Sequence, residues 1–242
     1  MARINGRQAK LGIDIHAAAG FGTATACTKA IAVDSLAMPL NVSRLTNSPI
    51  GRNQNMFTNI QRGNKAPTVE LTGKMGFNNG YAEMLAQFFG TSAAPTEQTV
   101  GQGDYKHTLL FNTTRLAFYL TMAAQATTTE LFELRDLAWQ EISFSYGGPY
   151  PNWLPATFSG IANDRVDAAA SQVNTYAGLT ALAIPATDEA VIQSSHRFRI
   201  NGDSAGALAN GDTLAVKSLE VVYNDPLEQP FEINGNAFNP AP

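Results

Sequence analysis

The sequence predicts a mainly β protein made of two related β units, and three observations support this fold class. The first is an internal repeat, in which LAWQEISFSY at 137–146 returns as LAVKSLEVVY at 214–223. The second is that apolar residues occupy every second position in both copies, as in a strand with one buried face. The third is composition, because only 15% of residues are charged, against ~25% in a typical soluble domain. Small polar and turn-forming residues take their place.

Each copy of the repeat continues through a turn into a second short segment. These segments are PATFSG at 155–160 and PFEING at 230–235, and a looser echo, PTVELTG, lies at 67–73. Repeated β units are typical of proteins that assemble with quasi-symmetry, but gene duplication also occurs in ordinary enzymes. The repeat alone therefore leaves both alternatives open.

The first unit is expected to span residues 1–125. It begins with an arm at 1–22, which mixes polar residues with Gly and Ala, and continues with an alternating strand at 29–38. Near its end, 105–111 and 116–121 predict a hairpin.

The clearest helix is predicted at 79–90, in the middle of this unit. Four apolar residues recur at i, i+3, i+4 and i+7, and a glycine supplies the left-handed stop. These residues are Tyr81, Met84, Leu85, Phe88 and Gly90. A lone helix of this length needs a sheet to cover.

A long loop is expected at 41–65. It holds six Asn residues, four basic residues and no acid, and loops of this length are usually functional or disordered. One interpretation is an arm that reaches a neighbouring subunit, where its basic residues meet acids; the other is a plain surface loop. The candidates for inter-ring or inter-subunit contact are Arg44, Arg52, Met56, Phe57, Arg62 and Lys65.

The second unit, 126–242, is expected to hold both copies of the main repeat. Between the copies the pattern fades into Ala-rich sequence, with a short helix expected near 188–192. A strand at 196–200 and an Asn-Gly turn at 201–202 follow. We therefore expect each unit to combine β strands with modest helix.

Several classes of function are disfavoured. The net charge of −4 argues against a protein that grips nucleic acid through phosphates. Cys27 is the only cysteine, so the chain builds neither an internal disulfide nor a cysteine zinc cluster. No run approaches the ~20 apolar residues that span a bilayer, and the N-terminus lacks the apolar core of a signal peptide. We expect a soluble protein without a secretion signal.

Catalytic and metal sites find little support. Ser204 lies in a G-x-S-x-G pattern at 202–206, but the helix that a nucleophile elbow requires does not follow it. His16, His107 and His196 lie far apart, and the Asn-Gly-Asp triplets do not match a calcium loop. We expect no enzyme activity, no metal and no cofactor.

The order of elements resembles that of a tail tube protein, the major tail protein of long-tailed bacteriophages. The resemblance rests on PTVELTGKMGF, the helix YAEMLAQFFG, LRDLAWQEISFSYGG with PATFSGIAND, HRFRING, and LAVKSLEVVYND with PFEINGN. It covers most of the chain from about residue 30 onward.

The resemblance implies two β-sandwich or barrel-like units, each with a flanking helix, whose inner sheets join those of neighbours around a lumen. Rings then stack into a tube, which removes exposed sheet edges. Ordinary family members form hexamers, whereas duplicated members form trimers with pseudo-sixfold symmetry, so the repeat favours a homotrimer. An unsheathed, flexible siphophage tail is the version expected of duplicated members.

The resemblance also implies a role and partners. The tube would hold the tape measure protein, meet tail terminator and baseplate proteins, and conduct double-stranded DNA during ejection without binding it. The protein would be assembled in the host cytoplasm and reside in the virion tail. Acids on the lumen wall would let the duplex slide, and the candidates are Glu130, Glu133, Asp136, Glu141, Asp212 and Glu220. The alternative is that these acids lie on an outer, solvated face.

Two other functions remain open. One is a carbohydrate- or surface-binding β-sandwich module, in which Trp139, Tyr150 and Trp153 form a stacking platform. In the simpler interpretation Trp139 belongs to the core. The other is a serine hydrolase that uses Ser204, ranked last.

Overall fold

The computed structural model describes parts of the chain from residue 10 to residue 225. The described residues are 10–46, 60–76, 79–91, 96–97, 105–106, 109, 117–126, 130–147, 153–184, 191–193, 198–199 and 210–225.

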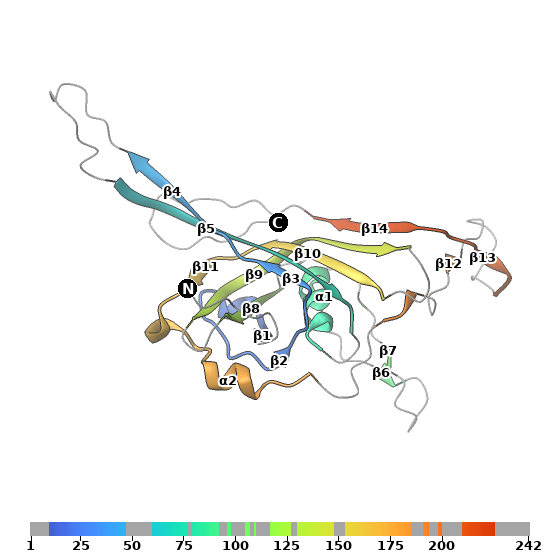
Figure 1. The fold of residues 1–242 in the computed structure, drawn as a ribbon, viewed down its shortest axis with the longest axis horizontal. Coiled ribbons are helices and arrows are strands. Elements are labelled where there is room, and N and C mark those ends of the chain that lie inside the picture. Colours follow the sequence, from blue (N-terminus) through green and yellow to red (C-terminus); the bar gives the residue numbers. More distant parts are fainter. Residues whose placement is uncertain are drawn as a thin grey trace.

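Most described strands belong to one hydrogen-bonded network, in which the long strand β9 (Leu131–Tyr146) takes part in two sheets (Figure 1). The first sheet contains β2 (Lys29–Ala30), β1 (Lys10–Ala17), β8 (Phe118–Gln125), the N-terminal half of β9, and β11 (Asp164–Val166). The second sheet contains β14 (Leu219–Asn224), the C-terminal half of β9, β10 (Pro155–Ile161), β5 (Ile60–Lys74) and β3 (Ser35–Ala37). All pairings are antiparallel, and the predicted mainly β fold is confirmed.

Asp136 marks the place where β9 passes from the first sheet to the second. Among the described non-glycine residues it alone has a positive φ, 49°. The register with β8 shifts here, since Leu120 pairs with Leu137 but Met122 pairs with Leu134. One extra residue on β9 forms a β-bulge, which bends a strand and increases its twist. The bend lets one strand serve both sheets.

The core lies between the two sheets and is completed by helix α1 (Tyr81–Phe89). The helix packs against β1, β8 and β9 and buries Tyr81, Met84 and Phe88 completely. Each such side chain contributes roughly 1.5–3 kcal/mol through removal from water. The predicted helix is confirmed, as is its stop at Gly90, which has φ 68°.

The two copies of the repeat pair with each other. β14 lies antiparallel beside β9, so that Val221 is the cross-strand partner of Phe144. These two residues occupy equivalent positions of the repeat, and a local pseudo-twofold axis therefore passes between them. The looser echo behaves in the same way, because β5 and β10 are also antiparallel neighbours, with Leu71 opposite Phe158.

Several sequence-based expectations need correction. The strand expected at 29–38 is split into β2 and β3, because residues 31–34 cross from the first sheet to the second. Most of the hairpin expected from 105–111 and 116–121 lies outside the described residues. Where these segments are described, β8 pairs with β1 and β9, and β7 (Tyr105–Lys106) pairs with β6 (Thr96–Glu97). The second helix, α2, covers Tyr176–Ala181. Ile192, where a helix was expected, forms a bridge with Trp153.

The stretch expected to be a loop at 41–65 is β strand at both ends. β4 (Leu40–Thr46) pairs with the first part of β5, and the two project from the body as a ribbon (Figure 1). A ribbon that leaves the sheets has no core to face, so its sequence needs no period-2 pattern. The residues between 46 and 60 lie outside the described part.

Strands from both predicted units share each sheet. The expected boundary near residue 125 falls between β8 and β9, which are neighbours in the first sheet, and β5 pairs with β10 in the second. The division into units 1–125 and 126–242 stays a sequence-based prediction. Short elements complete the described fold: β12 (Phe198–Arg199) with β13 (Thr213–Leu214), and 3-10 turns at Ala18–Gly20, Ala169–Ser171 and Asn210–Asp212.

Candidate assembly surfaces

The outward side of the second sheet carries small polar side chains and faces away from α1 and the first sheet (Figure 1). We call it the polar face. The strand register arranges its side chains in rows. One row is Ser35, Thr72, Thr157, Ser143 and Val222; the next is Ala37, Glu70, Ser159, Glu141 and Asn224; and Lys74, Ser145 and Glu220 lie one step further along. None of these residues is buried, whereas the alternating residues Leu71, Phe158 and Ile142 are fully buried.

The polar face carries more acids than bases. Its acids are Glu70, Glu141 and Glu220, and its one base is Lys74. Between them lie short hydroxyl side chains that bond within rows, as Thr72 Oγ1 does with Thr157 Oγ1 at 3.2 Å. Such a surface presents negative charge and short side chains to a molecule that passes over it.

The outward side of the first sheet is covered instead. Two covering segments, residues 18–28 and 167–184, cross it and are joined by Asn174, whose Nδ2 donates to the Thr25 carbonyl oxygen at 3.2 Å and whose Oδ1 accepts from the Cys27 amide at 2.7 Å. Leu179 of α2 sits over Gly12 of β1, where an added Cβ would lie 2.7 Å from its Cδ2. The outward side of the first sheet is therefore buried.

Glu133 lies beneath the second covering segment, so its predicted place on a lumen wall is corrected. Its side chain is fully buried. Oε2 accepts from the amides of Val173 and Asn174 and from Asn174 Nδ2, each at 2.9 Å, while Oε1 accepts from Arg135 at 2.9 and 3.0 Å. A carboxylate with this many donors fastens the segment to the sheet.

Asp136 is also removed from the lumen candidates, because it is fully buried beneath the first covering segment. Its Oδ2 accepts from the Gly22 amide at 2.9 Å and from Asn163 Nδ2 at 2.8 Å, and its Oδ1 lies 3.1 Å from His16 Nε2. Asp and Asn tolerate positive φ better than other non-glycine residues. The side chain therefore both permits the bulge and holds the segment that covers it.

The other four acidic candidates lie in different places. Glu141 and Glu220 are on the polar face, where they stay candidates for a lumen wall. Glu130 is exposed just before β9, at the far end of the first sheet, and Asp212 is partly exposed in a 3-10 turn. The structure adds Glu70 to the acids of the polar face, although it was not among the candidates predicted from the sequence. Its position between the apolar residues Val69 and Leu71 is the pattern that indicates an outward-facing side chain.

The ribbon carries the described basic candidates. The register sets Arg44 opposite Arg62, and Lys65 opposite Val42. Since 41–65 contains no acid, the ribbon has a local excess of positive charge. Arg52, Met56 and Phe57 lie outside the described residues.

The described structure does not assemble the residues expected for a carbohydrate-binding platform or for a serine hydrolase. Trp139 is fully buried and packs edge-on against Phe158 at 5.3 Å, so it is a core residue and not part of a stacking platform. Trp153 is 44% exposed, while Tyr150 and Ser204 lie outside the described part of the chain. His107 and His196 lie outside it too.

No potential metal cluster of three or more His, Cys, Asp or Glu residues occurs among the described residues. No helix in this part of the chain has the length and apolar character needed to cross a bilayer.

Three titratable groups in the described part of the chain have a raised pKa that favours the neutral form. Burial raises the pKa of the Cys27 thiol to about 12, and Asp14 and Glu133 add to the rise. Burial, with Asp136 nearby, raises the pKa of Tyr119 to about 12. Burial also raises the pKa of Tyr146, with a further contribution from Tyr223. These groups are therefore protonated near neutral pH, when a nucleophile would need to be ionised.

Comparison with known proteins gave structural likenesses only. No family model matches the chain, and no curated protein matches it. One similar solved structure is the tube-terminating cap of the anti-feeding prophage, with TM-score 0.40 and 8% identity, covering 69% of this chain and 93% of that one. A chain of the native gene transfer agent virion has TM-score 0.38 and 9% identity, with 68% and 98% covered.

A third similar structure is the sheath–tube complex of an extracellular contractile injection system (PVC) in its extended state. Its TM-score is 0.35 at 6% identity, with 67% of this chain and 89% of that chain covered. TM-scores this low do not establish a shared fold.

Proposed function

We propose that the protein is the tube-forming subunit of a bacteriophage tail, with the polar face lining the lumen. The observation that carries the proposal is the contrast between the two sheets. The first sheet is covered on both sides, whereas no residue of the polar face is buried by the part of the chain that the structure describes, and acids outnumber bases there. The order of sequence elements resembles that of tail tube proteins, which supports the same role.

The chemistry of the polar face suits the passage of DNA. A duplex carries one negative charge per ~1.7 Å of its axis, and proteins that hold it do so through Lys and Arg. Glu70, Glu141 and Glu220 repel phosphates, and short Ser and Thr side chains leave little to grip. The duplex would therefore slide past without specific binding.

The two outer strands of the second sheet suggest how neighbouring copies join into a closed ring. β14 and β3 are its two outer strands among the described elements. An exposed edge is a template for pairing with another chain. We propose that β14 of one copy meets β3 of the next, so that the second sheets join around the lumen.

We propose six copies per ring rather than the expected three. A trimer with pseudo-sixfold symmetry requires two such faces per chain, and the described residues form one.

The ribbon is proposed to link stacked rings. It projects beyond the body and carries Arg44, Arg62 and Lys65 without an acid, which suits an acidic surface on a neighbouring copy. Arg52, Met56 and Phe57 stay candidates for the same contact. The proposed partners are further copies of this chain, the tape measure protein, and terminator and baseplate proteins, in a virion tail assembled in the host cytoplasm.

Negative-stain microscopy and native mass measurement of the purified full chain test the proposal. We expect hollow rings or tubes whose ring mass is six times 25.8 kDa. Rings of three copies would leave the tube-forming role standing but would contradict the proposed number of six copies per ring. A protein that stays monomeric at all concentrations and salt conditions would overturn the proposed function.

A further inference from the structure

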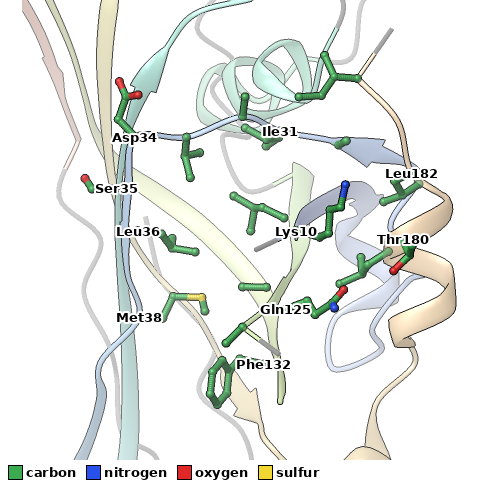
Figure 2. Close-up of a pocket in the computed structure, with 18 of the residues that line it drawn as sticks. Lys10, Ile31, Asp34, Ser35, Leu36, Met38, Gln125, Phe132, Thr180 and Leu182 are labelled. Atoms are coloured by element: carbon green, nitrogen blue, oxygen red, sulfur yellow. The ribbon is translucent and has the colours of Figure 1, made fainter. Parts of the chain in front are cut away.

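A groove of about 940 Å³ opens between the edges of the two sheets (Figure 2). One wall comes from β3 and the segment before it, with Ile31, Leu36 and Met38, and the opposite wall comes from β1, β8 and the end of α2. Phe132 of β9 lies at its base in the view of Figure 2. Its size falls within the ~300–1,000 Å³ of sites that enclose a ligand.

One polar atom in the groove lacks the partner that burial demands. Gln125 is 5% exposed, and its Oε1 accepts no hydrogen bond from the part of the chain that the structure describes. An unsatisfied buried acceptor costs ~1–3 kcal/mol. The groove thus combines apolar walls and polar side chains with a position for one N–H donor. Lys10 supplies positive charge at the groove and Asp34 negative charge, while Arg165 is ion-paired with Asp167 at 2.8 Å.

We propose that the groove binds residues 226–242 of the adjacent copy in the ring. This inference rests on the proposed function. The segment has the matching chemistry, because it contains two acids, Glu228 and Glu232, no Lys or Arg, and the apolar residues Leu227, Phe231, Ile233 and Phe238. As an extended chain it also supplies backbone N–H groups for Gln125.

The sheet register places the start of this segment beside the neighbour's groove. Asn224, the last residue of β14, lies in the same row as Ala37 at the opposite edge of the sheet, through Glu141, Ser159 and Glu70. When β14 of one copy meets β3 of the next without stagger, Asn224 lies level with the neighbour's Ala37. The following residue there is Met38, which lines the groove.

The position of the groove, rather than the length of the segment, favours the neighbour's groove over the chain's own. The own groove lies beneath β3, at the far edge of the sheet from β14, roughly 20 Å away across four strand spacings. The neighbour's groove lies directly across the proposed contact. Seventeen residues span at most about 56–61 Å when extended, so the segment is long enough to enter the groove with residues to spare.

Crosslinking of assembled full-length chains tests the inference. One chain carries Leu36→Cys and the other Phe231→Cys; they are mixed, allowed to assemble, and treated with a short bismaleimide at neutral pH. Met38→Cys serves as a second groove variant in case Leu36→Cys impairs folding. The unmodified chain is one control, since the raised pKa of Cys27 keeps its thiol protonated. Lys29→Cys, exposed on β2 outside the groove, is the matched control.

We expect a covalent dimer when a groove variant is mixed with Phe231→Cys, and its loss when Lys29→Cys replaces the groove variant. Rings that form but give no such dimer would overturn this inference and leave the proposed function standing. A crosslink found only within a chain that carries both cysteines would assign the groove to the chain's own segment, which also overturns it. Absence of rings would overturn both proposals.

Discussion

Two buried carboxylates on β9 hold the covering segments on the outward side of the first sheet. Glu133 and Asp136 are both fully buried, and each fastens one covering segment by accepting hydrogen bonds from it. Buried charges are normally paired or fully hydrogen-bonded, because an unpaired one is costly. At the residue scale, these acids have a structural role rather than one in contact with DNA.

Glu133→Gln should destabilise the protein by about 2–3 kcal/mol, because an amide group cannot accept from both Arg135 and the three donors of Val173 and Asn174. Chemical denaturation of the unassembled protein measures this loss. Glu130→Gln is the matched control, since Glu130 is exposed three residues earlier, and it should change stability by no more than ~0.5 kcal/mol. Equal effects of the two variants would contradict the assigned role.

At the scale of elements, α1 is positioned by two glycines whose missing side chains leave room for it. A Cβ at Gly73 of β5 would lie 2.1 Å from Tyr81 Oη, and one at Gly80 would lie 2.4 Å from Ile13 Cγ2. Tyr81 Oη donates to the Ala32 carbonyl oxygen at 3.1 Å. The helix is thereby tied both to the second sheet and to the segment that crosses between the sheets.

Gly73→Ala should cost about 2–3 kcal/mol through overpacking against Tyr81. Tyr81→Phe should cost about 1 kcal/mol through loss of its hydrogen bond. The double variant should be less destabilised than the sum of the two, because removal of the hydroxyl makes room for the new methyl group. Denaturation of all four proteins gives the coupling.

Gly211→Ala provides the control for this cycle, because no heavy atom lies within 4 Å of an added Cβ there. It should be nearly neutral. Strict additivity of Gly73→Ala and Tyr81→Phe would show that the glycine does not make room for the helix.

Across the whole molecule, the polar face and the ribbon carry charge of opposite sign. Acids outnumber bases on the face proposed to meet DNA, and bases without acids lie on the ribbon proposed to meet other copies. Because only 15% of all residues are charged, large parts of the surface suit contact with neighbouring subunits. A tube formed in this way would keep an acidic wall inside.

Charge reversal on the polar face should convert a sliding surface into a binding one. Glu70→Lys, Glu141→Lys and Glu220→Lys together should leave ring formation intact but make assembled tubes bind duplex DNA at low salt. This binding should weaken steeply as salt rises. Fluorescence anisotropy with a labelled duplex measures it, with the unaltered tube as reference.

Glu130→Lys is the matched reversal, because Glu130 is exposed but lies outside the polar face. It should add no comparable binding inside the tube. Equal DNA binding by tubes with Glu130→Lys and with Glu141→Lys alone would contradict the assignment of the lumen wall.

Local periodicity and backbone preference are enough to predict the mainly β class, the helix with its glycine stop and the pairs of related strands. Long-range packing, in contrast, places the repeats side by side and makes the two ends of 41–65 a ribbon. It also buries Glu133 and Asp136, while Glu70 joins Glu141 and Glu220 outside. Alternation reveals which residues share a face of a strand. Which face is covered depends on segments far away in the chain, such as 18–28 and 167–184, whose packing no local pattern records.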